Sequence, residues 1–184
     1  MKPLSRARVR RLHTPRHVRP LACAIVLAVA IPATAGAADP PILAIEPRVG
    51  RGVSLGGGAG EASARLSPLT FGVLVEYAFR SDPWVSCYGG PYAELLDRGS
   101  IGAIAGLRFR PASGWARIGL GGVAIFAPYT LAGPTVSFGG SFAVGGVPLS
   151  VDIEGAAFVV GNDLPAGTVA GQIQVVVGVP LEVF

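Results

Sequence analysis

Charged residues are scarce in this chain of 184 residues, in which they make up 14% of the sequence. An ordinary soluble domain has about 25%. Cysteine is also rare, and its two copies exclude a disulfide-rich scaffold. Hydrophobic residues, in contrast, make up 51% of the chain, and 27 residues are glycine. This composition excludes a disordered chain and a basic nucleic-acid-binding tail.

The basic residues are concentrated at the N-terminus. Seven of the 15 Lys and Arg residues lie between Met1 and Pro20 with no acid among them, and the apolar run from Leu21 to Ile31 follows. Small residues at A-x-A spacing then lead to Asp39. This order is typical of a secretory signal peptide, and a spanning helix would need roughly 20 apolar residues. The sequence predicts a signal peptide at 1–38 and one mature domain at 39–184.

Removal of the signal peptide changes the charge and the available chemistry. Eight Arg then face eleven acids, so the net charge falls from +4 to −3. His13 and His17 leave with the signal peptide, and Cys87 is the only remaining thiol. Ser–His pairs, Cys–His pairs and histidine metal sites are therefore excluded from the mature chain. We expect a protein that is not an enzyme and has no cofactor or metal site.

The mature chain alternates between apolar and small or polar residues. The clearest window is 69–80, where Leu, Phe, Val and Tyr share one parity and mostly Thr, Gly, Glu and Arg share the other. Such period-two alternation predicts β-strands, and no window has a helical period. The sequence therefore predicts an all-β fold. Eight strands are expected, at about 42–55, 69–80, 84–95, 101–110, 115–126, 135–144, 151–159 and 168–177.

The predicted connections alternate in length. Tight turns are expected at 81–83, 111–114 and 146–149, where Gly, Pro, Ser and Asp are frequent. Longer links separate the other strands, at 56–67, 96–100, 128–134 and 161–167. An antiparallel up-and-down meander with short turns at one end and longer loops at the other is typical of transmembrane β-barrels.

The character of the side chains indicates which face of the barrel points outward. The polar parity is mostly Gly, Ala, Ser and Thr, which suit the narrow lumen of an eight-stranded barrel. The Leu, Ile, Val and Phe parity would form a large exposed apolar surface in water, so we expect it to face lipid. Trp84 and Trp115 each follow a short turn, the position of an interfacial aromatic girdle. A secreted soluble barrel is the less favoured alternative.

These features resemble the small outer-membrane β-barrels, the eight-stranded proteins of the OmpA-transmembrane and OmpX type. The resemblance covers roughly 41–184 and includes a C-terminal aromatic residue, Phe184. It implies that Phe184 is the signal read by the barrel-assembly machinery. The lipid-facing parity of the last strand is odd, so Phe184 would need a bulge near Pro180 to face outward.

Most charged strand residues fall on the inner parity, near the short-turn end. One hypothesis is a salt-bridged layer that closes the lumen, because buried charges are tolerated when they pair. The alternative is a charged constriction that conducts small ions. Glu94 is expected further along the lumen. Arg51 falls on the lipid-facing parity, a misfit that implies a bulge, a register change or an interfacial position. The predicted layer consists of Glu46, Arg48, Glu76, Arg80, Arg108, Arg110, Arg117, Asp152 and Glu154.

The sequence thus predicts a non-enzymatic integral outer-membrane barrel of a Gram-negative-type bacterium. It would have a largely closed lumen and a structural or surface-interaction role. A narrow channel or a small-ligand carrier is the alternative use of the same lumen. The expected partners are outer-membrane lipid and, during biogenesis, the barrel-assembly machinery. We expect a monomer that binds no nucleic acid.

Overall fold

The computed structural model describes residues 43–58, 61–79, 82–95, 99–111, 115–164 and 167–183. The predicted signal peptide at 1–38 lies outside these residues, as do Arg80 and Phe184. None of the described segments is a helix long and apolar enough to cross a membrane.

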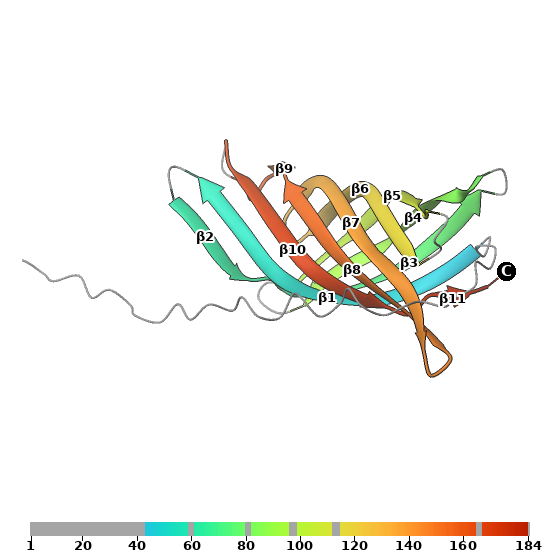
Figure 1. Ribbon diagram of the computed structural model, residues 1–184. Helices are drawn as coiled ribbons and strands as arrows, with labels where there is room; N and C mark the ends of the chain where they lie inside the picture. Colours follow the sequence, from blue (N-terminus) through green and yellow to red (C-terminus); the bar gives the residue numbers. More distant parts are fainter. Residues whose placement is uncertain are drawn as a thin grey trace, which may run out of the picture. The chain divides into compact units, whose positions relative to one another are not determined.

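Eight long strands form a closed antiparallel barrel (Figure 1). Each strand pairs with the next one along the chain, and the last, β10, pairs with β1 to close the sheet. The predicted all-β, eight-stranded up-and-down barrel is therefore confirmed. The strands are β1 (Leu43–Gly58), β3 (Leu69–Phe79), β4 (Asp82–Leu95), β5 (Ser100–Phe109), β6 (Ala116–Ala127), β7 (Leu131–Val144), β8 (Val147–Phe158) and β10 (Val169–Gly178).

Three short strands pair with the ends of the long strands, so parts of the predicted links are strands in the structure. β2 (Glu61–Leu66) lies in the expected loop 56–67 and pairs with the end of β1. β9 (Val160–Gly161) pairs with the start of β7, and β11 (Leu181–Glu182) pairs with the start of β1. The two residues of β9 and of β11 are too few to show a period of two. β2 does alternate, with Glu, Ser and Arg on one parity and Ala, Ala and Leu on the other, but the sequence prediction assigned this stretch to the loop.

The predicted alternation is present around the barrel. In β3 the even residues Leu74 and Glu76 are buried, whereas the odd residues Phe71, Val73 and Val75 are exposed. The parity changes in β6, where odd residues face the lumen. The outer wall is apolar over most of the barrel, because most outward side chains are Leu, Ile, Val, Phe and Ala. Arg51 of β1 is a charged exception.

The hairpin between β7 and β8 corrects one turn prediction. The expected turn at 146–149 is instead a two-residue turn at Gly145 and Gly146, and Val147 is already paired with Val144. Both glycines have positive φ, 59° and 84°. A two-residue hairpin turn of this kind matches the twist of its strands and requires left-handed backbone at both positions.

Replacement of Gly145 or Gly146 by alanine is expected to destabilise the barrel by about 1 kcal/mol, because alanine does not readily adopt a positive φ. Urea unfolding in lipid vesicles would measure this loss. Alanine at Gly171, which has ordinary φ and only van der Waals neighbours at 3.8 Å or more, is the matched control. Equal stability of all three variants would contradict the turn assignment.

The C-terminal segment contradicts the expected bulge near Pro180. The register that pairs Arg48 with Gly178 continues unchanged to Ala44 and Glu182 on the far side of Pro180. The backbone hydrogen bond from Val179 N to Pro47 O, 3.0 Å long, keeps the ladder continuous. The ladder runs regularly because the missing proline N–H interrupts no bond that this register requires. The expected bulge, which would have moved position 184 onto the outward parity, is therefore absent between Gly178 and Glu182.

Arg51 lies on the outer face, as its parity indicated. It is exposed and pairs with Val175 within an unbroken β1–β10 register. No bulge or register change between β1 and β10 accounts for its position.

Candidate functional site

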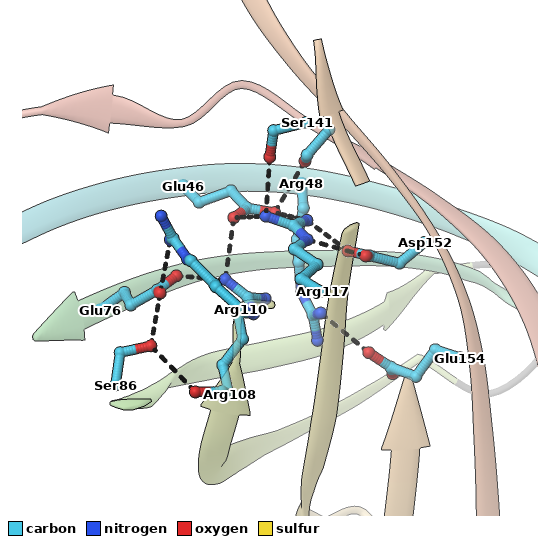
Figure 2. Close-up of polar contacts among 11 residues, drawn as sticks. Glu46, Arg48, Glu76, Ser86, Arg108, Arg110, Arg117, Ser141, Asp152 and Glu154 are labelled. Atoms are coloured by element: carbon cyan, nitrogen blue, oxygen red, sulfur yellow. Dashed lines mark hydrogen bonds and ion pairs between the residues drawn. The ribbon is translucent and has the colours of Figure 1, made fainter. Parts of the chain in front are cut away.

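A layer of buried charges crosses the lumen near the short-turn end (Figure 2). Glu46 of β1 lies at its centre and is 1% exposed. Its carboxylate accepts hydrogen bonds of 3.1 and 3.0 Å from Arg117 and one of 3.3 Å from Arg108. Ser150 Oγ donates a further bond of 2.9 Å. One carboxylate from β1 thus joins side chains of β5, β6 and β8 across the barrel.

The two arginines also bind a second set of carboxylates. Arg117 Nε donates to Asp152 Oδ1 at 2.8 Å, and Arg117 Nη2 contacts Asp152 Oδ2. Arg108 contacts Glu76, which also accepts a 2.6 Å bond from Arg110 Nη2. Each guanidinium of Arg108 and Arg117 therefore links two carboxylates from different strands. Such paired, charge-assisted bonds are the strongest of the ordinary hydrogen bonds.

A further ion pair, between Arg48 and Glu154, connects this layer to the middle of the lumen. Arg48 Nη1 donates to Glu154 Oε2 at 2.8 Å, and Gln174 Nε2 donates to Glu154 Oε1 at 3.0 Å. Thr70 Oγ1 in turn donates to Gln174 Oε1 at 2.9 Å. The chain of donors and acceptors satisfies polar groups that would otherwise be costly to bury.

The structure brings eight of the nine predicted layer residues together, and Arg80 lies outside the described residues. Those eight are Arg48, Arg108, Arg110, Arg117, Glu46, Glu76, Asp152 and Glu154. Their four positive and four negative charges cancel, which offsets much of the cost of burying them. Polar partners that the sequence reasoning did not single out include Ser86, Ser150 and Gln174. Their place on the inner parity was the only signal for them.

An apolar cluster fills the lumen next to the charged layer. Leu74, Ile104, Val123, Ile125 and Phe158 are each at most 5% exposed, and two tyrosines, Tyr88 and Tyr92, complete the cluster. Together with the charged layer, this cluster fills the narrow interior with side chains, as expected for an eight-stranded barrel.

Glycines make room for one of these side chains. The ring of Tyr88 lies 5.1 Å from the guanidinium carbon of Arg108, and its hydroxyl reaches the backbone of β5 and β6. A Cβ at Gly106 or Gly121 would lie 2.7 or 2.8 Å from that hydroxyl. The ring of Tyr88 therefore packs against the backbone of Gly106 and Gly121, where any side chain would take its place.

Alanine at Gly121 is expected to destabilise the barrel by about 1–3 kcal/mol, because its Cβ has no room in the packed lumen. The added atom would lie 2.3 Å from Ala105 O as well as against Tyr88. Its neighbour Gly122 faces outward, and a Cβ there would meet nothing closer than Gly133 O at 3.5 Å. Urea unfolding should leave Gly122→Ala near wild type, and a similar loss in both variants would contradict this packing.

A pocket opens at the other end of the lumen, where the longer links lie. It encloses about 280 Å³ between residues of β1, β2, β4, β6, β7, β8 and β10. Glu94 lies in its wall, away from the charged layer, and accepts hydrogen bonds from three hydroxyl groups. The sequence placed Glu94 further along the lumen but did not predict these partners.

Two solved structures have a similar arrangement of strands and low sequence identity to this chain. The attachment invasion locus protein Ail of Yersinia pestis is 13% identical, with a TM-score of 0.46, over 76% of this chain and 97% of that one. Neisserial surface protein A is 15% identical, with a TM-score of 0.42, over 74% and 96%. No family model matches the chain. No curated protein matches it either.

The continuous pairing from β1 to β10 decides the class by itself. The chain is a small, closed β-barrel. Trp84 and Trp115 lie at the short-turn end of this barrel, and each is 47% exposed.

Proposed function

We propose that the mature chain is an integral outer-membrane β-barrel with a closed lumen and a structural or surface-interaction role. The observation that carries this proposal is the inversion of polarity: paired charges fill the interior while the outer wall is apolar. Four Arg and four carboxylates are ion-paired inside, and residues such as Leu120 and Phe138 are 52% and 55% exposed outside. A soluble barrel would require the opposite arrangement.

The composition of the outer wall supports the proposal that the barrel is surrounded by lipid. Exposed Leu, Ile, Val and Phe side chains occur on every long strand. On β4 the only one of these is Leu95 at its end, and the outward positions before it are Val85, Cys87, Gly89, Pro91 and Ala93. Trp84 and Trp115 at the short-turn end would lie at the membrane interface, the usual position of aromatic girdles. Aromatic rings are favoured there because one part is apolar and another donates a hydrogen bond.

The side chains that fill the lumen support the proposal that the barrel is closed to ions. An ion passing through would have to break bonds between Glu46, Arg108 and Arg117, and then cross the apolar cluster around Leu74. Both steps are unfavourable, since separated charges and bare ions are costly to bury. A channel role for the charged layer is therefore the less favoured hypothesis.

Electrophoresis of the membrane fraction tests the membrane assignment. A folded transmembrane barrel is expected to stay with the membranes and to change its mobility in detergent gels after boiling. A mature chain that remains soluble without detergent and shows no heat-dependent shift would overturn the proposal. We further expect a monomer that reaches the membrane through the signal peptide and the barrel-assembly machinery.

A further inference from the structure

The pocket at the long-link end, here called the mouth pocket, has no part in the closure of the lumen that is proposed above. Its apolar wall includes Ile125, Leu131 and Phe158, and its polar lining includes Glu94, Tyr129 and Arg65. The volume of about 280 Å³ lies just below the usual range for small-molecule sites, about 300–1,000 Å³, and so suits a small ligand. The charged layer and apolar cluster close the lumen beyond it, so an occupant could enter and leave only through the mouth.

Glu94 differs from the other buried carboxylates of the lumen. Glu46, Glu76, Asp152 and Glu154 all form ion pairs with arginine. Glu94 is 5% exposed, yet within the segments that the structure describes its partners are neutral hydroxyl groups. These are Tyr92 at 3.0 Å, Ser100 at 2.8 Å and Tyr129 at 3.0 Å.

Within the described residues, these three hydroxyl groups leave part of the acceptor capacity of Glu94 unused, since a carboxylate has about four acceptor sites. A buried carboxylate is stabilised most by a cation. The rings of Phe158 and Tyr129 line the same pocket, and aromatic rings also attract organic cations. Arg65, the basic residue in the lining, is exposed at the rim and so is screened by solvent.

We propose that the mouth pocket binds a small organic ammonium ion whose cationic nitrogen contacts Glu94 and whose apolar body packs against Ile125, Leu131 and Phe158. Binding would occur without passage through the barrel. The site goes beyond the proposed structural or surface role and would give the closed barrel a ligand on its long-link side.

The matched probes for this site are 2-phenylethylammonium and its neutral analogue 2-phenylethanol. They would be titrated against the folded mature protein in maltoside micelles, with chemical shifts of residues lining the pocket as the readout. Phosphocholine detergents are avoided because their head groups are themselves quaternary ammonium ions. We expect the ammonium to bind at the mouth pocket at least about tenfold more tightly than the alcohol, the ratio expected for one charged hydrogen bond.

Glu94→Gln should remove that preference by weakening ammonium binding about tenfold while leaving alcohol binding unchanged. Glu182→Gln is the matched control, because Glu182 is exposed near the short-turn end and should have no effect. Arg65→Gln removes a positive charge from the rim of the pocket, so this variant should bind the ammonium as well as the wild type or better. The heat-dependent gel shift verifies that each variant is folded, and Tyr129→Phe, which keeps the carboxylate, serves as a second variant that should retain the preference.

Equal affinity for the two probes, or an unchanged preference in Glu94→Gln, would overturn the proposal. Arg98 lies outside the described residues. The Arg98→Gln variant therefore tests whether the guanidinium of Arg98 already neutralises the carboxylate of Glu94. Ammonium binding that appears only in Arg98→Gln would show that the wild-type carboxylate is already neutralised and would equally overturn it. Failure of this binding would leave the gel shift and the closed lumen unaffected, so the two proposals are tested separately.

Discussion

Glu46→Ala is expected to lower the free energy of unfolding by about 3–5 kcal/mol, the usual cost of removing one partner from a buried ion-pair network. Glu46 accepts bonds from Arg108, Arg117 and Ser150, and it is nearly inaccessible to solvent. Without its charge the layer carries an excess positive charge between two guanidinium groups. Urea unfolding in lipid vesicles, followed by Trp84 and Trp115 fluorescence, would measure the loss.

Two further variants make this prediction specific to the charge of Glu46. Glu46→Gln keeps the shape and part of the hydrogen bonding, so it should lose less stability than Glu46→Ala. Glu182→Gln changes an exposed carboxylate and should stay within about 0.5 kcal/mol of wild type. A loss below 1 kcal/mol in Glu46→Ala would mean that the network contributes little to the folded state.

Leu120→Arg is expected to destabilise the barrel by about 2–4 kcal/mol, as charged residues do on the lipid face near the midplane of a bilayer. Leu120 lies in the middle of β6, is 52% exposed, and pairs with Leu107 and Val136 on the neighbouring strands. In a soluble barrel the same change would put a charge into water at little cost. Unfolding in vesicles would distinguish these outcomes.

A second substitution at the edge of the barrel controls for the chemistry of arginine. Leu181, in the short strand β11 near the short-turn end, is 50% exposed, so its exposure matches that of Leu120. Leu181→Arg should cost about 0–1 kcal/mol if it lies at the membrane interface. The account would be wrong if both substitutions were neutral or if their costs were equal.

The barrel was predictable because each residue of a closed sheet must face either the lumen or the outside. In β3 this requirement makes Leu69 to Phe79 alternate, and the same pattern in the other long strands predicted their number. The inner parity, together with a position near the short-turn end, also placed Glu46 and Arg117 in one layer although 71 positions separate them in the chain. Period and polarity were sufficient for the strands, and the layer also required the pattern of short turns.

Partners and exact boundaries were not predictable in the same way. Whether Glu46 reaches Arg117, Arg108 or another cation depends on the stagger of strands around the barrel, which alternation does not encode. The turn at Gly145 was missed because Val147, Pro148 and Leu149 continue the β8 strand beyond its regular alternation. Of the hydroxyl groups around Glu94, that of Tyr92 lies two residues away on the same face of β4, but those of Ser100 and Tyr129 come from other segments and only the folded chain brings them to Glu94.

Single-channel recording in a planar bilayer tests the closed lumen most directly. The purified, folded barrel is expected to give no reproducible conductance steps, because the ion-paired layer and the apolar cluster around Leu74 fill its interior. Reproducible steps in the wild type that change when Arg108 or Glu76 is neutralised would show that ions pass through the layer, and would contradict the account.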